Sequence, residues 1–273
     1  MRQQQQASRH STWSGSSTAF RSLSTSLCNM KIAAITTIYR RPLLTNIVLR
    51  HWAWLRDQLV FDLEIFTAVS PDDDPNLGML SVPSCVTLVE APNDPLGRKW
   101  NTVARKAAGI DPDALLVFGS DDLVSAGYLN LVASLVEYGH DYVEPDSCHF
   151  YDAASGKCSE LTGAMIGAGR TFSRGVLEAV PHLWGEVHRS PDHNQATVLR
   201  DAGFLPYRIR LAEHHTLRSG RPVIMDVKTD VHRWPFRDFT PTVNPQCQWA
   251  DGQALLDSCF PTAAEAVPAL MAP

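Results

Sequence analysis

The first half of the chain alternates short apolar runs with segments of helical periodicity. Apolar, β-branched runs at residues 31–38, 62–69 and 86–90 predict buried strands, and each is followed by a turn. Apolar residues return at helical spacing after Pro42, and a further helix is predicted from about residue 97 to residue 108. Strands that alternate with helices as far as residue 124 predict an α/β fold with a mostly parallel, doubly wound sheet and helices on both faces.

The pattern changes after residue 140. Two apolar segments flank a Ser-Gly-Lys turn within residues 141–161, which predicts a hairpin and therefore a mixed region of sheet. Helices are expected at 128–138, at 173–179 and from about residue 191 to the glycine at 203, with a last strand at 207–211. Pro, Ala and polar residues prevail beyond residue 240. We therefore expect one domain over residues 30–240 and a poorly ordered tail over residues 241–273.

Residues 1–29 differ in composition from the rest of the chain. They are rich in Gln, Ser, Thr and Arg, and the first acidic residue is Asp57. Such a segment cannot bury enough apolar surface to order itself, so a disordered N-terminal extension is expected. It resembles an organelle transit segment, but a start placed too far upstream is the favoured interpretation, because Met30 directly precedes the first strand.

Charge and cysteine usage narrow the function classes. The formal net charge of −5 offers no basic field of the kind that attracts nucleic acid. No apolar run is long enough for an integral membrane span. The six cysteines form no C-x-x-C pair, which disfavours a thiolate zinc site, and their scatter fits a reducing, cytoplasmic compartment.

The stretch at residues 115–124 carries the first candidate chemistry. A buried strand ends at Gly119-Ser120, and two carboxylates, Asp121 and Asp122, follow at once. Ligands of open α/β sheets bind outside the carboxyl ends of the strands, and adjacent carboxylates favour a cation between them. Oxygen-only ligands suit Mg²⁺ or Mn²⁺, which commonly bridge to a diphosphate. The alternative is that both aspartates merely cap the helix that follows.

The order of these motifs over residues 31–220 resembles the GT-A glycosyltransferases, particularly the family 2 type that uses nucleotide-diphosphate sugars. The resemblance implies a GT-A-like fold, Mn²⁺ or Mg²⁺, a nucleotide-sugar donor and a saccharide or other hydroxyl acceptor. Gly119-Ser120-Asp121-Asp122 falls on the metal-binding D-x-D of that family, with Gly119 in place of its first Asp. The late metal histidine falls on His214-His215, for which a surface pair is the alternative. The resemblance therefore implies metal ligation by Asp121, Asp122 and one of these histidines.

Nucleotide contacts are implied at three further places. These are the turn after the first strand, the acidic loop after the second strand, and the start of the helix near residue 97. A solvated helix face is an equally open interpretation of Lys99. The residues expected at the nucleotide are Thr37, Tyr39, Arg40, Asp72, Asp73, Gly97, Lys99, Asn101, Ser120 and Asp121.

Ser190-Pro191-Asp192 falls on the catalytic Glu-Asp pair of the same family. Pro191 replaces the Glu, so Asp192 is left alone as the base that deprotonates the acceptor. Attack from the face opposite the diphosphate would invert the anomeric centre. The alternative role of Asp192 is a helix cap, and Glu186 is the second candidate for the base.

Two other function classes stay open. A nucleotidyltransferase also uses a strand-end metal carboxylate on a similar sheet. It normally carries a Gly-rich loop after the first strand, whereas Thr-Thr-Ile-Tyr-Arg-Arg contains no glycine. The other class is a non-catalytic module on the same fold that binds a nucleotide or a sugar.

Overall fold

The computed structural model describes residues 27–73, 77–163, 167–188, 191–214, 220–229 and 234–270. The strands are β1 (Lys31–Thr37), β2 (Asp62–Val69), β3 (Val86–Glu90), β4 (Ala114–Val117), β5 (Asp122–Val124), β6 (Tyr142–Pro145), β7 (Ser147–Asp152), β8 (Cys158–Thr162), β9 (Thr171–Ser173), β10 (Tyr207–Ile209), β11 (Ile224–Lys228) and β12 (Cys247–Ala250). The α-helices are α2 (Pro42–Arg56), α4 (Leu96–Ala108), α5 (Ala126–Glu137), α6 (Arg174–Ala179), α7 (Pro191–Asp201), α8 (Gly252–Cys259) and α9 (Ala266–Ala269). Short 3-10 turns are η1 (Pro71–Asp73), η2 (Leu211–His214) and η3 (Phe236–Phe239).

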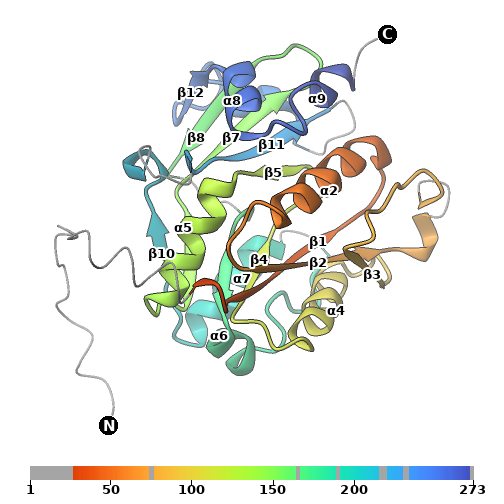
Figure 1. Ribbon diagram of the computed structural model, residues 1–273, viewed down its shortest axis with the longest axis vertical. Coiled ribbons are helices and arrows are strands. Elements are labelled where there is room, and N and C mark those ends of the chain that lie inside the picture. Colours follow the sequence, from red (N-terminus) through yellow and green to blue (C-terminus); the bar gives the residue numbers. More distant parts are fainter. Residues whose placement is uncertain are drawn as a thin grey trace.

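A seven-stranded sheet forms the base of the molecule, in the order β10-β6-β9-β4-β1-β2-β3 (Figure 1). Within this sheet, the adjacent strands β3, β2, β1 and β4 run parallel to one another, while β9 runs antiparallel to both β4 and β6. The α/β class and the mostly parallel sheet expected from the sequence are confirmed. The carboxyl ends of β1, β2 and β4 therefore lie together at one edge of the sheet.

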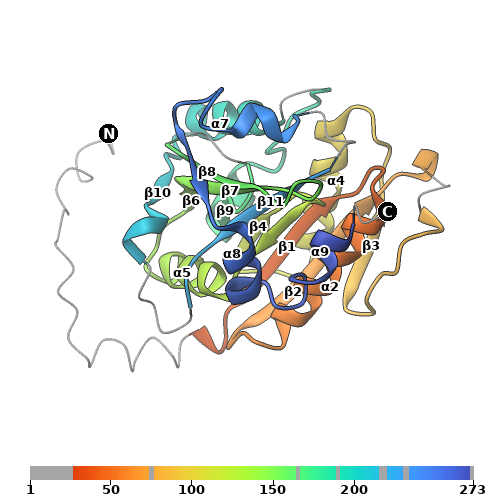
Figure 2. The same ribbon diagram turned by 90° about the horizontal axis from the view of Figure 1, so that it is seen from above.

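Alternate residues of β1 supply two apolar clusters, one on each face of this sheet. Ile32 packs in a cluster that includes α2 and α5, while Ile35 packs with α4, α6 and α7. The pleat of the strand produces this division, since successive side chains point to opposite faces. Figure 2 shows α2 and α5 on one side of the sheet and α4 and α7 on the other. Helices cover both faces, as the sequence predicts.

The chain passes three times from this sheet into a second, five-stranded sheet of order β12-β8-β7-β11-β5, the last time between β10 and β11. It leaves the first sheet at the end of β4 and enters the second at β5, and it repeats the crossing from β6 to β7. Phe118 lies in the first crossing and stacks on Trp52 of α2, with ring centroids 3.9 Å apart. The acidic turn at residues 119–122 therefore lies between the two sheets.

The second sheet contains the predicted hairpin and two strands that the sequence pattern did not indicate. β7 and β8 pair antiparallel, with His149 opposite Glu160. β11 then inserts between β7 and β5, parallel to β7 and antiparallel to β5. This insertion places residue 226 directly beside the acidic turn.

The segment after residue 240 differs from the poorly ordered tail that we expected. β12 pairs with β8, and α8 and α9 pack beside the second sheet (Figure 1). Leu256, Phe260 and Val267 are fully buried in the same apolar cluster as Ile32. Residues 241–270 therefore belong to the folded unit, because several of their apolar side chains are buried in one core.

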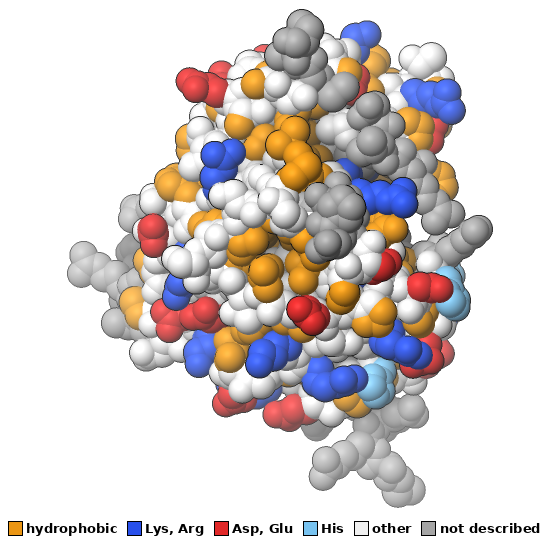
Figure 3. Space-filling model, turned by 90° about the vertical axis from the view of Figure 1, so that its right-hand side faces the viewer, with side chains coloured by type: hydrophobic (Ala, Val, Ile, Leu, Met, Phe, Trp, Pro, Cys, Tyr) orange, Lys and Arg blue, Asp and Glu red, His pale blue; other side chains and the backbone are white. Residues whose placement is uncertain are grey.

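The N-terminal boundary also lies a little earlier than expected. Leu27 and Met30 are buried in the apolar cluster of α2, whereas residues 1–26 lie outside the described part of the chain. Among the described helices, none combines the length and the apolar character needed to cross a bilayer. On the described part of the face in Figure 3, acidic and basic side chains are interspersed around apolar ones, with no extended area of one charge.

Candidate active site

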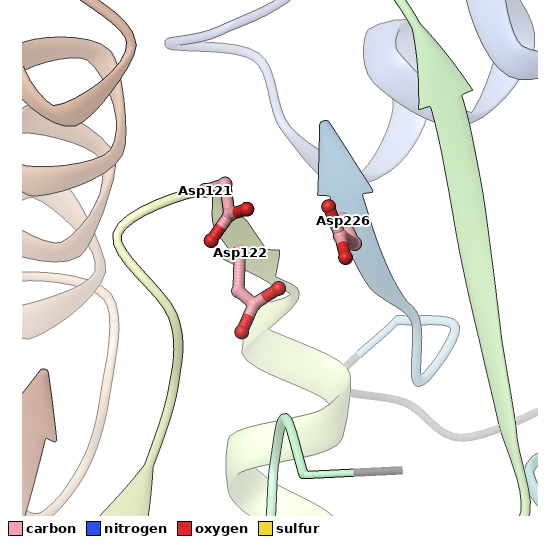
Figure 4. A group of neighbouring side chains, drawn as sticks. All are labelled: Asp121, Asp122 and Asp226. Atoms are coloured by element: carbon pink, nitrogen blue, oxygen red, sulfur yellow. The ribbon is translucent and has the colours of Figure 1, made fainter. Parts of the chain in front are cut away.

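Three carboxylates converge where the two sheets meet. Asp121 and Asp122 come from the crossing between β4 and β5, and Asp226 comes from β11. The strand register places Asp226 opposite Asp122, and the Val227 amide donates to the Asp121 carbonyl at 2.9 Å. One oxygen of each carboxylate lies within 4.8 Å of the others, and Figure 4 shows the three side chains facing a common space.

The cluster is electrostatically suited to a divalent cation. Burial is the largest cause that raises the pKa of Asp122 well above its ordinary value, and the nearby Asp121 and Asp226 raise it further. The Gly119 amide donates to the Asp122 carboxylate and partly offsets this effect. A cation among the three groups would remove their mutual repulsion, and oxygen donors favour Mg²⁺ or Mn²⁺. The residues therefore fit the metal that the sequence motif implies.

Two basic side chains already neutralise part of this charge. The Arg41 Nη1 lies 2.6 Å from the Asp121 Oδ2, and its Nη2 donates to the Ser120 Oγ at 3.1 Å. The Lys228 Nζ lies 2.6 Å from the Asp226 Oδ2. The side chain of Arg41 is 20% exposed, whereas that of Lys228 is only 7% exposed.

Gly119 explains why the motif departs from D-x-D. A Cβ at this position would lie 2.5 Å from the Asp121 Oδ1 and 2.8 Å from the Asp122 Oδ2. Real Cβ contacts of this length essentially never occur, so any side chain here would push the two carboxylates apart. A side chain at position 119 would therefore require both carboxylates to shift from the positions that form the acidic cluster.

A cavity of about 460 Å³ opens beside the cluster and contains a fourth carboxylate, Asp192. A Cβ at Gly167 would lie 2.5 Å from the Asp192 Cγ, so the carboxyl packs directly over the glycine backbone. The cavity walls are lined by Trp100, Val117, Phe118, Gly119, Asp121, Asp122, Cys148, Phe150, Leu161, Gly167, Ala168, Asp192, Asp226, Trp234 and Phe239.

Asp192 lies in the first turn of α7, which a buried arginine holds in place. The Arg170 Nη1 donates to the Asp192 carbonyl and to the Gln195 Oε1, both at 2.8 Å. Its Nη2 lies 2.9 Å from Glu144, so the guanidinium is compensated although it is fully buried. Asp192 is exposed as a residue, but partial desolvation by the surrounding protein raises the pKa of its carboxyl, an effect that Arg170 opposes and Glu144 increases. Since α7 begins at Pro191, Asp192 lies inside the helix and does not cap it.

Lys99 is enclosed by the protein, which contradicts the solvated helix face. Its Nζ donates to the Ile38 carbonyl at 2.5 Å, to the Ser70 Oγ at 2.6 Å and to the Asn93 Oδ1 at 3.3 Å. These groups follow β1, β2 and β3 in turn. Lys99 therefore holds three strand ends together beneath the site.

Gly97 and Asn101 hold the loop that leads towards α7. The Gly97 amide donates to the Val187 carbonyl at 2.8 Å, and a Cβ at Gly97 would lie 2.6 Å from the Gly185 carbonyl oxygen. The Asn101 Nδ2 donates to the same Gly185 carbonyl, and its Oδ1 accepts from the Trp184 amide. Both residues make close contacts with protein backbone, and their predicted contact with a nucleotide stays a prediction.

The other predicted nucleotide residues lie at the carboxyl ends of β1 and β2. Thr37 ends β1, and Tyr39 follows it with the Arg40 guanidinium carbon 4.9 Å from its ring centroid. Asp72 is exposed in η1, and the side chain of Asp73 lies outside the described residues. The fold places these positions at the expected edge of the sheet.

The structure does not place two other groups of predicted site residues at the aspartate cluster. Glu186 is 70% exposed and pairs with Arg98 at 3.1 Å, and it does not line the cavity. Among the described residues, the acidic group contains the three aspartates and not His214, while His215 lies outside the described chain. The third acidic member is therefore Asp226.

Sequence reasoning missed Asp226, Lys228 and Arg170. The signal for the first two was an acid and a base at alternate positions of the apolar run Val-Ile-Met-Asp-Val-Lys. Such a pattern places both charges on one face of a buried strand, where each needs a partner.

No family model matches the sequence, and no curated protein matches it. The chain is similar in structure to Drosophila β1,4-galactosyltransferase 7, crystallised with manganese, UDP-Gal and xylobiose, with 11% identity, a TM-score of 0.48, and coverage of 76% of this chain and 74% of the other. It is also similar to a 4-diphosphocytidyl-2C-methyl-D-erythritol synthase, with 13% identity, a TM-score of 0.46, and coverage of 67% and 88%. Likenesses this distant leave the function to be argued from the site itself.

Proposed function

We propose that this protein is a metal-dependent glycosyltransferase that moves a sugar from a nucleotide-diphosphate donor to an acceptor hydroxyl with inversion. One observation carries the proposal. A cluster of three carboxylates suited to a divalent cation and a separate carboxylate, Asp192, line the same cavity at the junction of the two sheets. A metal-assisted transfer with inversion uses both of these groups at once.

Asp121, Asp122 and Asp226 would hold Mn²⁺ or Mg²⁺. When bound, the ion supplies positive charge that stabilises the departing diphosphate. Asp121 and Asp122 stand at the start of β5 and Asp226 lies on β11, and the hydrogen bonds between these two strands fix the spacing of the carboxylates. This rigid origin suits a site that must bind an ion in one position.

Asp192 would accept the proton of the acceptor hydroxyl. As that oxygen forms its bond to the anomeric carbon, the bond from this carbon to the diphosphate oxygen breaks, and the electron pair leaves with the diphosphate. The raised pKa of Asp192 makes its carboxylate a better base near neutral pH. Arg170 would keep the residue in position by holding its carbonyl.

Part of the cavity wall is apolar and aromatic. Phe150 and Phe239 stack with ring centroids 3.8 Å apart, and Trp234 lies at the cavity with 61% of its surface exposed. Aromatic faces bind the apolar faces of sugar rings well, because they offer large flat area and little rotational freedom. This wall supports a saccharide as the acceptor.

The proposal is tested by calorimetric titration of UDP and GDP with and without Mn²⁺, followed by assays of turnover. Asp226→Asn should lower metal-dependent nucleotide affinity by at least about tenfold, since a charged ligand is lost. Asp201→Asn is the matched control, because Asp201 is 71% exposed at the end of α7. Equal melting temperatures of both variants would show that the fold is intact.

The turnover assays separate the alternative functions. A glycosyltransferase releases nucleoside diphosphate from a nucleotide-sugar, and a panel of such sugars identifies the donor. Release of pyrophosphate from a nucleoside triphosphate would indicate a nucleotidyltransferase instead. Tight nucleotide binding without either product would indicate a non-catalytic module, and unchanged affinity in Asp226→Asn would contradict the metal assignment.

A further inference from the structure

Arg41 is directed into the acidic cluster by an unusual turn. Arg40 and Arg41 have φ angles of 56° and 70°, the left-handed region that non-glycine residues rarely adopt. Pro42 follows as the first residue of α2, and its ring restricts the backbone of the preceding residue. Two strained residues in succession need compensation from their surroundings, and the contacts of Arg41 with Asp121 and Ser120 provide part of it.

The net charge of the acidic cluster indicates which ligand complements it once a metal ion is bound. With all three aspartates ionised, as a bound cation would require, their three negative charges and the two positive charges of Arg41 and Lys228 give the protein groups a net charge of −1. A divalent cation would change this to +1. A diphosphate, which is strongly anionic, would then be the complementary ligand.

We propose that Arg41 is an internal counter-ion that exchanges partners when substrate binds. In the absence of ligands its guanidinium pairs with Asp121, and with metal and diphosphate present it donates to phosphate oxygens instead. The inference rests on the proposed function, because it assigns the diphosphate of the donor to the same site. It also predicts that metal and diphosphate bind cooperatively, since each favours the release of Arg41 from Asp121.

Arg41 suits this exchange better than the other basic residue of the cluster. Lys228 is almost fully buried, and its Nζ lies 5.4 Å and 5.2 Å from the ring centroids of Phe150 and Phe239. Arg41 is more accessible and presents a planar fork that matches two oxygens of a carboxylate or a phosphate. It also precedes α2, a helix with no acidic residue in its first turn, so the helix dipole favours an anion nearby.

The test measures two affinities that should move in opposite directions in Arg41→Gln. Mn²⁺ alone should bind about five- to tenfold tighter than to the wild type, because no guanidinium competes for Asp121. Methylenediphosphonate, a diphosphate analogue without a base, should bind at least about tenfold more weakly in the presence of saturating Mn²⁺. Both are measured by calorimetry on the full chain, without reference to turnover.

Two further variants complete the test. Arg56→Gln removes the same charge from the other end of α2, where Arg56 pairs with Glu64, and should leave both affinities unchanged. Arg41→Lys keeps the charge but cannot contact Asp121 and Ser120 together, so both affinities should lie between those of the wild type and Arg41→Gln. Unchanged or weaker Mn²⁺ binding in Arg41→Gln, or unchanged diphosphate binding, would overturn the exchange while leaving the metal site intact. Failure of the wild type and of Arg41→Gln to bind Mn²⁺ at all would overturn the proposed function as well.

Discussion

At the scale of single residues, the site works by placing charges where the fold already limits water. Asp192 and Glu186 illustrate the difference between two carboxylates close together in sequence. Both residues are exposed, but Asp192 lines the cavity and has a raised pKa, whereas Glu186 lies outside the cavity and pairs with Arg98. Only the first combines access to a bound substrate with increased basicity.

We predict that Asp192→Asn lowers kcat by at least about a hundredfold while donor affinity and melting temperature stay near their wild-type values. Asparagine keeps the size of the side chain but cannot accept the proton. Glu186→Gln is the matched control and should keep nearly full activity. A loss of activity in Glu186→Gln alone would transfer the role of base to Glu186. Product NMR provides a second check, because retention of configuration would contradict a single displacement.

The candidate site could be predicted from the sequence only in part. Asp121 and Asp122 follow an apolar run, so their place at a strand end is a local property. Asp226 reaches the same site through the pairing of β11 with β5, a contact across about a hundred residues of chain. The motif implies that His214 or His215 is a metal ligand, but no local pattern in the sequence reports strand register.

At the scale of elements, α2 connects three parts of the chain that lie far apart in sequence. Its His51 is fully buried, and its Nε2 lies 2.8 Å from the Val124 carbonyl of β5 while its Nδ1 lies 2.9 Å from the Thr262 Oγ1. The ring can satisfy both contacts when it is neutral, with the Nε2 donating and the Nδ1 accepting. Burial lowers the pKa of His51 from 6.5 to about 4.

This lowered pKa predicts a specific loss of stability in acid. The unfolded chain takes up a proton at this histidine as pH falls below 6.5, whereas the folded chain does so only near pH 4. Above pH 6.5, the neutral His51 contributes about 3 kcal/mol to the free energy of unfolding. This contribution is lost progressively as the pH decreases to about 4. Chemical unfolding across this range should show a shallower pH dependence in His51→Gln than in the wild type. The control is His182→Gln, at an exposed position, which should follow the wild-type curve.

Regular elements with a clear period were predicted well, and those defined by long-range contacts were not. The strands at β1, β2 and β3 and the helices α2 and α4 have continuous apolar patterns, and all lie where expected. The short helices α8 and α9 are rich in Ala and polar residues, so their pattern resembled a loose tail. Their order comes from packing of α8 against the second sheet and of α9 against α2, which sequence alone does not reveal.

At the scale of the whole molecule, the two sheets share a single apolar cluster. Ile32 of β1, Phe118 of the crossing, Val227 of β11 and Phe260 after α8 all belong to it. Each sheet therefore depends on the other for burial of its apolar face. The acidic cluster lies where the sheets join, so the geometry of the site depends on the integrity of both.

We predict that Phe260→Ala destabilises the whole protein in one cooperative step. Phe260 is fully buried, and its truncation should lower the free energy of unfolding by about 3–5 kcal/mol through lost burial and a residual cavity. Because the cluster is shared, far-UV and near-UV circular dichroism should report the same lowered midpoint. Leu205→Ala, at a side chain that is 73% exposed, should change stability by less than about 0.5 kcal/mol. Two separate transitions, with the earlier one confined to the second sheet and the C-terminal helices, would contradict this prediction. They would show that the two sheets fold independently and that the aspartate cluster forms only when the two folded units dock.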